Sequence, residues 1–220
     1  MTFSLAGRCP RTGMLGAVVT TSSIAVGSRC AHVRAGVGAA LTQHRTDPRL
    51  GPIMLELMAR SRTAHQALDA AAAGATDPEW RQLACIDAAG ATASFSGACV
   101  RPERGEVHGR DCVAIANIVR TEAVPRDMVH AFEADPALPL AERLLRAIVA
   151  GEAAGGEFIP LASAALLVAH RHGFAYVDLR VDSHPTPLQE LARLWHAYAP
   201  LADDYVSRAD VPGYVPPPEP

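Results

Sequence analysis

The chain has 220 residues, of which 49% are hydrophobic and 20% are charged, a composition typical of a globular protein with a sizeable core. Its formal net charge of −3 argues against a nucleic-acid partner or an anionic membrane surface, which proteins usually bind through basic patches. The sequence has no apolar run of membrane-spanning length and its start lacks signal-peptide features, which predicts a cytoplasmic location.

The chain begins with a predicted β-hairpin. In residues 2–6 the side chains alternate, with Thr2, Ser4 and Ala6 on one face, a pattern typical of a strand. Residues 10–13 have the proline and glycine of a tight turn, and residues 15–19 form the second strand. The first strand therefore starts at the second residue of the chain.

A thin, glycine-rich strand is predicted over residues 34–41, where backbones can approach one another closely. A polar loop at residues 42–48 leads to a helix that contains residues 53–58, where apolar side chains recur at helical spacing. A second helix is predicted over residues 64–73, because Gly74 is a typical helix end.

The middle of the chain contains further strands and then two helices. Strands are predicted at residues 83–87, 92–95 and 112–118. Apolar residues at helical spacing then indicate one helix around residues 128–132 and another around residues 140–148. Hairpin connections between strands are favoured by the short glycine-containing segments that separate them.

The last elements are two strong strands at residues 164–169 and 175–181, followed by a helix. Thr186 in the capping position, followed by Pro187 at the first helical position, marks the start of this helix. Residues 211–220 are proline-rich and are expected to be extended or disordered.

This order of elements predicts a single α+β domain over residues 1–208 and a proline-rich tail over residues 209–220. Because hairpin-type connections dominate, the sheets should be mainly antiparallel with helices packed outside them. The helix that starts at Pro187 has an apolar stripe; if the core leaves it exposed, that stripe would suit a homodimer.

Thr2 is a candidate nucleophile. A threonine hydroxyl needs a base, and when threonine is the first residue of the mature chain its own α-amine can take the proton. Methionine is commonly removed before a small residue, so trimming of Met1 would create this arrangement. The alternative is an ordinary strand that starts early and does no chemistry.

Several blocks of the sequence resemble the bacterial and archaeal family known as domain of unknown function 1028, and the resemblance runs from Met1 to about Arg208. The blocks that carry it are "MTFSLAGRCPRTGMLG", "AVGSRCAHVRAGVGAALTQHRTDPRLGP", "RQLACIDAAGATASFSG", "LAERLLRAIVAGEAAGGE", "SAALLVAHRHGFAYVDLRVDSHPTPLQELARLW" and "DDYVSRA". The family is placed in the N-terminal-nucleophile (Ntn) hydrolase superfamily, which implies a four-layer αββα sandwich of two mainly antiparallel sheets.

The resemblance also implies catalytic roles. Thr2 would be the nucleophile after removal of Met1. By a loose positional comparison with proteasome β-subunits, Ser22 or Ser23 would occupy the place of a hydroxyl or carboxylate after the second strand. Arg34 would supply a cation on the third strand, although its guanidinium stays protonated and cannot act as a base.

Two carboxamides are candidates for stabilising an oxyanion. Gln43 follows Thr42 at the end of the glycine-rich strand, a junction that can supply an oxyanion hole from backbone N–H groups or a side-chain amide. Asn117 ends the strand at residues 112–118. The alternatives are a loop-capping pair at residues 42–43 and a turn-forming asparagine at residue 117.

Four residues are candidates for substrate contacts: Thr42, His44, Asp178 and Arg180. Asp178, Arg180 and Asp182 share one face of a strand, which favours a structural ladder of ion pairs; a substrate-carboxylate site using Arg180 is the alternative. His170 and His172 lack further ligands at metal-binding spacing and are interpreted as a turn, so no metal is expected. All 20 basic residues are arginine, which excludes lysine Schiff-base and lysine general-base chemistry.

The resulting hypothesis is an Ntn-type amidohydrolase that cleaves a small acyclic amide or an acylated amino-acid-like compound and needs no cofactor. A noncatalytic binding or assembly protein with the same fold is the alternative. A third possibility is a cysteine hydrolase using Cys30 or Cys112, which predicts inhibition by thiol reagents. Five cysteines without a C-x-x-C pair are otherwise typical of reduced, buried thiols.

Overall fold

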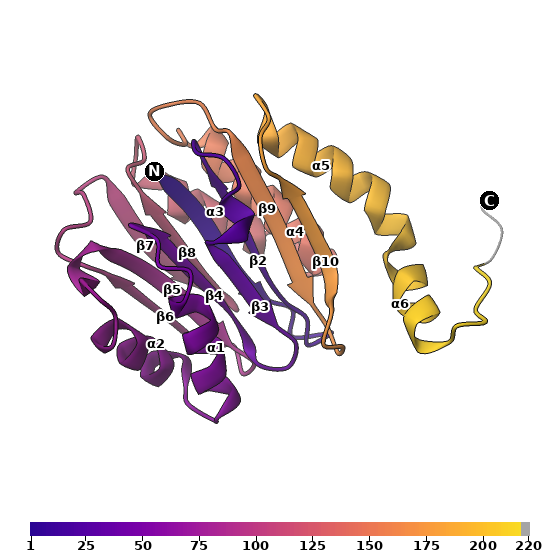
Figure 1. The fold of residues 1–220 in the computed structure, drawn as a ribbon. Coiled ribbons are helices and arrows are strands. Elements are labelled where there is room, and N and C mark those ends of the chain that lie inside the picture. The colour runs from indigo at the N-terminus through magenta and orange to yellow at the C-terminus, as the bar shows by residue number, and fades with distance from the viewer. Residues whose placement is uncertain (217–220) are drawn as a thin grey trace.

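Two antiparallel sheets lie face to face in the computed structural model, which describes residues 1–216 (Figure 1). The larger sheet has six strands, in spatial order β10 (Ala175–Val181), β9 (Ser163–Ala169), β2 (Leu15–Thr21), β1 (Thr2–Arg8), β8 (Cys112–Asn117) and β7 (Arg104–Gly109). The smaller sheet has four, in the order β3 (Ala31–Arg34), β4 (Gly38–His44), β5 (Arg81–Asp87) and β6 (Thr92–Ser96).

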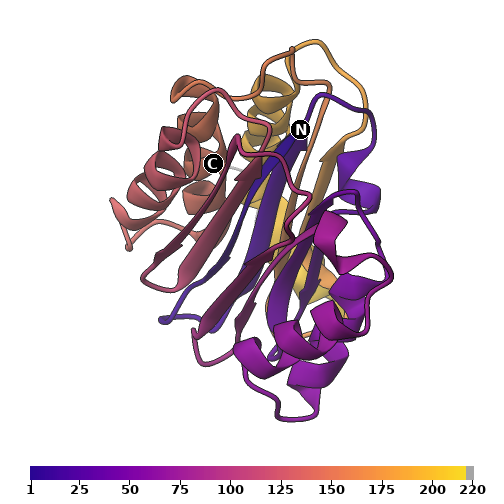
Figure 2. The same cartoon turned by 90° about the vertical axis from the view of Figure 1, so that its left-hand side faces the viewer.

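Helices cover the outer face of each sheet (Figures 1 and 2). The smaller sheet is covered by α1 (Leu50–Ala59) and α2 (Ala64–Ala73). The larger sheet is covered by α3 (Ala123–Glu133), α4 (Leu140–Ala153) and α5 (Pro187–Tyr198), and α6 (Ala202–Asp210) follows at its β10 edge. Within residues 1–216 there are also three short 3-10 turns: η1 (Val26–Ser28), η2 (Pro78–Trp80) and η3 (Ala199–Leu201).

Alternation along β1 assigns its two faces to different apolar cores. Phe3 and Leu5 pack with the helices that cover the larger sheet, whereas Ala6 belongs to the core between the two sheets. The inter-sheet core includes many small side chains, and small side chains let two sheets approach closely. Thr2 and Ser4 share the face of Ala6, so their hydroxyls point toward the smaller sheet.

Most of the expected elements are confirmed, including the opening hairpin, in which Phe3 pairs with Thr20 and Arg8 with Leu15. The expected α+β class with two antiparallel sheets is also confirmed. Among the described residues, every helix is too short or too polar to cross a bilayer.

The predicted strand over residues 34–41 is wrong. Arg34 is the last residue of β3, and β4 begins only at Gly38. The chain turns between them at Gly36, whose φ of +67° is readily adopted by glycine. The glycines therefore mark a hairpin turn, and two strands replace the one expected.

The C-terminal helix α5 begins at Pro187 as predicted, but Thr186 makes no side-chain capping bond. Its apolar stripe packs into the core through Leu188, Leu191 and Trp195, whereas Leu194 and Tyr198 stay partly exposed. The expected homodimer stays a prediction. The expected tail over residues 209–220 starts too early, because α6 continues to Asp210. Residues 217–220 lie outside the described part of the chain.

Candidate active site

Thr2 lies at the first position of β1, the strand that pairs with β2 on one side and β8 on the other (Figure 1). Its register partner on β8 is Asn117, and its Oγ1 lies 3.4 Å from Oγ1 of Thr21 on β2. The residue is only 6% exposed. The strand pairing therefore holds this hydroxyl at one end of the space between the sheets.

The main-chain carbonyl of Met1 accepts hydrogen bonds from the hydroxyls of both Thr2 and Thr21. Oγ1 of Thr21 donates to this carbonyl at 2.6 Å, and Oγ1 of Thr2 donates to it as well. Met1 is itself half-buried. With Met1 in place, the Thr2 nitrogen is part of a peptide bond and its hydroxyl is already engaged.

A network of carboxamides joins the two sheets beside Thr2. Ser4 Oγ donates to Gln43 Oε1 at 2.8 Å, and Gln43 Nε2 donates to Gln82 Oε1 at 2.7 Å. Asn117 Nδ2 donates to the same Gln82 oxygen at 3.0 Å. Gln43 Nε2 also lies 3.4 Å from the carbonyl oxygen of Thr2. All of these side chains are buried, so the network fixes their positions.

Asn117 has one atom that the network leaves unused. Its Oδ1 is buried and has no hydrogen-bond partner among the described residues. Asn117 is the direct neighbour of Thr2 across the sheet, which places an unsatisfied polar atom beside the candidate nucleophile. Buried polar atoms without partners are uncommon and are often found at functional sites.

Glu157 is the functional candidate that the sequence did not reveal. It is 5% exposed; its Oε2 accepts a 2.9 Å hydrogen bond from the Ser22 N–H, and its Oε1 is buried without a partner. Burial raises the pKa of its carboxyl, an effect opposed by the Ser22 hydrogen bond and by the nearby N-terminal amine. A glutamate after Gly155 and Gly156 carried no recognisable signal, because only the tertiary fold brings it to the chain start.

The pKa of the Met1 α-amine is shifted by the same surroundings. Burial lowers its pKa, while Glu157 acts in the opposite direction. Arg101 and Arg45 add positive charge that lowers the pKa further. An amine in this place is therefore less protonated than in water, as a base requires.

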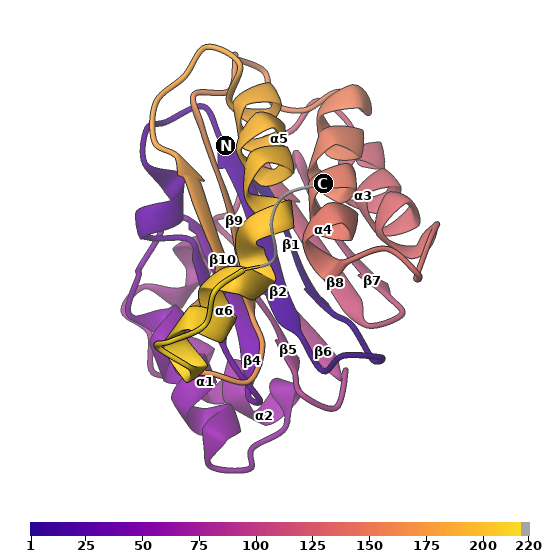
Figure 3. The same cartoon turned by 90° about the vertical axis from the view of Figure 1, so that its right-hand side faces the viewer.

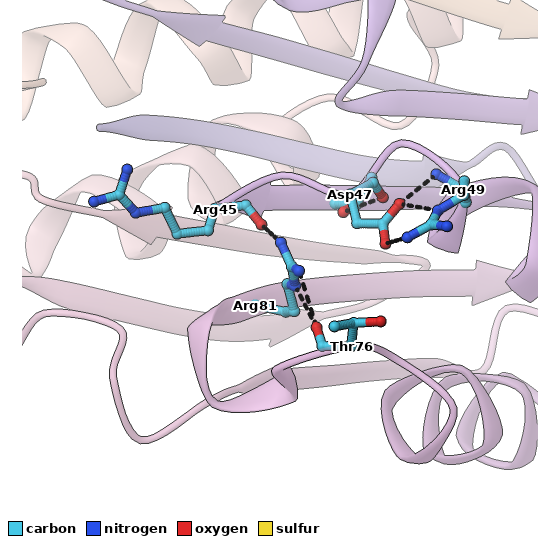
Figure 4. Close-up of polar contacts among 6 residues, drawn as sticks. Arg45, Asp47, Arg49, Thr76 and Arg81 are labelled. Carbon is cyan, nitrogen blue, oxygen red and sulfur yellow. Dashed lines mark hydrogen bonds and ion pairs between the residues drawn. The ribbon is translucent and has the colours of Figure 1, made fainter.

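The loop after β4 that carries Arg45 is held by hydrogen bonds (Figure 4). Arg81 donates to the Arg45 carbonyl and, at 2.9 Å, to the Thr76 carbonyl. Asp47 accepts two hydrogen bonds from the Arg49 guanidinium, at 2.9 and 2.8 Å. In Figure 4 the Arg45 side chain extends away from the Asp47–Arg49 pair, so its charge is not paired with Asp47.

The structure separates the two serines expected near Thr2. Ser22 directly follows Thr21, and its backbone N–H binds Glu157. Ser23 is exposed; its hydroxyl accepts a 2.6 Å hydrogen bond from Arg29 and its carbonyl accepts one from Ser163. Ser22 thus contributes to the surroundings of Thr2 through its main chain, whereas Ser23 is part of a loop network.

Arg34 is not near Thr2, which corrects the expected position of the cation. It pairs with Gly38 at the start of β4, and Gln43 lies five residues further along that strand, about 17 Å away. Its exposed guanidinium forms an ion pair with Glu56 at 3.2 Å. The cations that act on the N-terminal amine are Arg45 and Arg101 instead.

The residues at the end of β4 divide between the two faces of the sheet. Gln43 faces Thr2, but Thr42 lies on the opposite face, where its Oγ1 donates to the Asp47 carbonyl at 3.2 Å. The Thr42 N–H donates to the Cys30 carbonyl, so it is not free to bind an oxyanion. His44 is half-buried, with Nδ1 2.9 Å from the Trp80 carbonyl, and burial lowers its pKa.

Asp178 and Arg180 lie away from the candidate site, on the edge strand β10. Strands β9 and β2 separate β10 from β1, a distance of about 14 Å. Both residues are exposed, and Arg180 pairs with Asp182 at 3.1 Å. The expected contacts of Asp178 and Arg180 with a substrate bound at Thr2 are therefore wrong, and a single ion pair, Arg180–Asp182, replaces the expected ladder.

The two cysteines of the thiol alternative are poorly suited to react, and the described residues hold no cluster of metal-ligating side chains. Residues 1–216 contain no group of three or more His, Cys, Asp or Glu side chains able to hold a metal ion, and residues 170–173 form the connection between β9 and β10. Burial raises the pKa of the Cys30 thiol and raises that of Cys112 to about 12. Both thiols are therefore poorly suited to act as thiolate nucleophiles.

Comparison with known proteins gives one family match. Residues 2–191 match the model of a family described as "Family of unknown function (DUF1028)". A crystal structure of a Silicibacter pomeroyi protein assigned to DUF1028 is 30% identical, with a TM-score of 0.84 over 90% of this chain and 86% of that one. The Anbu protein (ancestral beta-subunit) from Yersinia bercovieri aligns over 99% and 100% of the two chains, but its 11% identity and TM-score of 0.41 support no inference. None of the curated proteins matches.

Proposed function

The chain belongs to the DUF1028 family of unknown function, and we propose that it is an amidohydrolase of the N-terminal-nucleophile type. The observation that carries this proposal is the placement of Thr2, whose hydroxyl lies between the sheets among Thr21, Asn117 and the carboxamide network. Two facing sheets between outer helices support the finer description of the fold as a four-layer αββα sandwich of Ntn-hydrolase type.

Removal of Met1 starts the proposed mechanism. It converts the Thr2 nitrogen from a peptide nitrogen into an α-amine, and it takes away the carbonyl that accepts hydrogen bonds from Thr2 and Thr21. The space left by Met1 becomes the place of the substrate. Arg45 and Arg101 favour a substrate that carries negative charge, such as an acylated amino acid.

The chemical steps follow from the groups around this amine. Thr2 Oγ attacks the substrate carbonyl carbon while its proton passes to the α-amine, which forms a tetrahedral oxyanion. The C–N bond then breaks, and the leaving amine takes the proton from the α-ammonium. Water attacks the resulting ester, again with the α-amine as base, and releases the carboxylic acid and free Thr2.

The proposal gives the surrounding polar groups two roles. Asn117 Nδ2 uses one N–H on Gln82 Oε1 and would offer the other to the oxyanion. Gln43 Nε2 would do the same after giving up its long 3.4 Å contact with the Thr2 carbonyl. The unpartnered Oε1 of Glu157 would accept a hydrogen bond from the new α-ammonium and orient it. In this proposal Glu157 has the role that the sequence analysis assigned to Ser22 or Ser23, that of the polar group beside the nucleophile.

A noncatalytic binding protein is the second candidate, and one observation favours it. In the chain with Met1 retained, the Met1 carbonyl already holds the Thr2 hydroxyl. A protein that keeps Met1 would have the fold without a free nucleophile.

The test starts from protein purified without an N-terminal tag. Intact mass measures the loss of Met1, and a threonine-directed β-lactone followed by peptide mapping measures the reactivity of Thr2. We expect a mass lower by one methionine and an adduct on Thr2. Thr2→Ala should abolish the adduct and lower turnover of any amide substrate by at least about a thousandfold.

Two further variants serve as controls. Thr2→Ser keeps a hydroxyl and should keep the label. Thr20→Ala removes a buried hydroxyl on the neighbouring strand, one that donates to the Ser163 carbonyl at 2.8 Å, and should also label normally. Retention of Met1, or a trimmed protein that the lactone does not label, would contradict the hydrolase proposal.

A further inference from the structure

A cavity lies at the end of the sheets opposite Thr2. Its volume is about 520 Å³, which suits a small organic molecule. The cavity is lined by the turn between β1 and β2, the turn between β7 and β8, and the segment from α3 to α4. In Figure 3 these segments meet at the end of the sheet away from the N-terminus. Its polar lining residues are Arg11, Arg110, Asp111, Glu133 and Arg143.

Arg143 is the unusual member of this lining. It is only 4% exposed, and among residues 1–216 it has no carboxylate within ion-pair distance. Its Nε donates to the Phe132 carbonyl at 2.9 Å, its guanidinium lies 3.9 Å from the centre of the Phe132 ring, and its Nη1 has no hydrogen-bond partner. A buried charge without a counter-charge is costly, so a missing anion is indicated.

The carboxylates in the lining are already engaged elsewhere. Asp111 Oδ1 pairs with Arg8 Nη1 at 2.7 Å, and Glu133 Oε1 accepts the Arg110 N–H at 2.5 Å. Arg11 donates to the Ala137 carbonyl at 2.8 Å through Nη2, which leaves its other donors available. Since Arg8 neutralises Asp111, the guanidinium groups of Arg11, Arg110 and Arg143 outweigh the charge of Glu133.

We propose that this cavity is a binding site for a small carboxylate with an apolar body. The carboxylate would pair with Arg143, because a guanidinium presents two parallel donors that match its two oxygens. Pro10, Pro136 and Ala137 provide the apolar part of the wall. The site is separate from Thr2, since β1 runs its full length from Thr2 to Arg8 between the two places.

The experiment measures binding of benzoate by calorimetry and compares it with benzamide, its neutral analogue of the same shape. The experiment uses the Thr2→Ala variant, so that the result does not depend on whether the proposed hydrolase activity exists. We expect benzoate to bind at least tenfold more tightly than benzamide and to bind more weakly at high salt. Equal binding of the two compounds, or no binding of benzoate at millimolar concentration, would overturn the proposal.

Variants identify the site. Arg143→Met should fold, because replacing an unpaired buried charge by an apolar side chain is often neutral or stabilising, and it should bind benzoate at least tenfold more weakly. Should this variant fail to fold, the exposed Arg110→Gln and Arg11→Gln provide the test, each with a several-fold loss. Arg34→Gln, exposed and outside this cavity, should bind as the parent does. Unchanged affinity in the cavity variants would place the benzoate elsewhere and refute the assignment.

Discussion

At the scale of single residues, Glu157 is held where its own charge is disfavoured. Its carboxyl is almost fully buried, and one of its oxygens has no partner. Because burial raises the pKa of this group, the folded chain favours its neutral form more than water does. The stability that Glu157 contributes is therefore present at low pH and is lost as the pH rises through its folded pKa.

Glu157→Gln should accordingly make the protein more stable at pH 8 than the parent. Glutamine cannot ionise, and its amide oxygen can still accept the Ser22 N–H. The difference in unfolding free energy, measured by urea titration, should shrink as the pH falls and vanish below about pH 4, where the unfolded glutamate is also protonated. The variant should at the same time reduce lactone labelling of Thr2, because the α-amine loses its partner.

The exposed Glu122 at the start of α3 is the control for this prediction. Glu122→Gln should change the unfolding free energy by less than about 0.5 kcal/mol at every pH. If Glu157→Gln is less stable than the parent at pH 8, the ionised carboxylate stabilises the folded state and the prediction is wrong.

The sequence predicted part of the candidate site. Thr2, Gln43 and Asn117 were found because they stand at strand ends, and the strand pairings bring those ends together. Glu157 was missed because it follows a helix far along the chain, and no local sequence pattern indicates that the chain there lies close to residue 2. Arg34 was expected at the site only from a positional comparison, and the turn at Gly36 places it at the opposite end of β4 from Gln43.

At the scale of secondary-structure elements, two threonines in equivalent cap positions behave differently. Thr63 forms a capping box with Gln66 at the start of α2. Thr186, before α5, makes no capping bond, and its Oγ1 lies 3.2 Å from His184 Nδ1 instead. The same residue type thus stabilises one helix start and not the other.

Thr63→Ala should lower the unfolding free energy by about 1 kcal/mol, because the Gln66 backbone N–H loses the Thr63 hydroxyl as its partner. Thr186→Ala serves as the matched control and should cost less than about 0.5 kcal/mol. Urea unfolding at neutral pH measures both. Equal losses in the two variants would contradict the difference in capping.

Elements with strong local patterns were predicted well, and those that depend on tertiary contacts were not. Residues 64–73 and 175–181 match α2 and β10. The strand β7 was missed because its sequence, RGEVHG, has little apolar character and it lies at the edge of the sheet. The helix α6 was missed because Ala202 and Val206 are its only buried residues.

At the scale of the whole molecule, the layers bury nearly all of the thiols. Cys99 is exposed, and the buried cysteines are Cys9, Cys30, Cys85 and Cys112. Burial raises the pKa of Cys85 and of Cys112 to about 12, so these groups stay protonated at neutral pH. The packing of the sheets and helices therefore decides which thiols can react.

A thiol reagent should modify one cysteine quickly in the native protein and all five in denaturant. Cys99→Ser should remove the fast reaction, which absorbance of the released chromophore measures. Fast modification of Cys30 or Cys112 in the native protein would contradict this expectation and favour the thiol hydrolase.

The half-buried start of the chain has a practical consequence. These 220 residues contain no lysine, so the α-amine is their sole primary amine. Burial lowers the pKa of this amine, which leaves more of it uncharged near neutral pH. An acylating dye would therefore report on one atom of the molecule, and the pH dependence of its coupling rate would titrate that atom directly. Chemistry that usually labels a protein at many places becomes a single-site probe of how the chain begins.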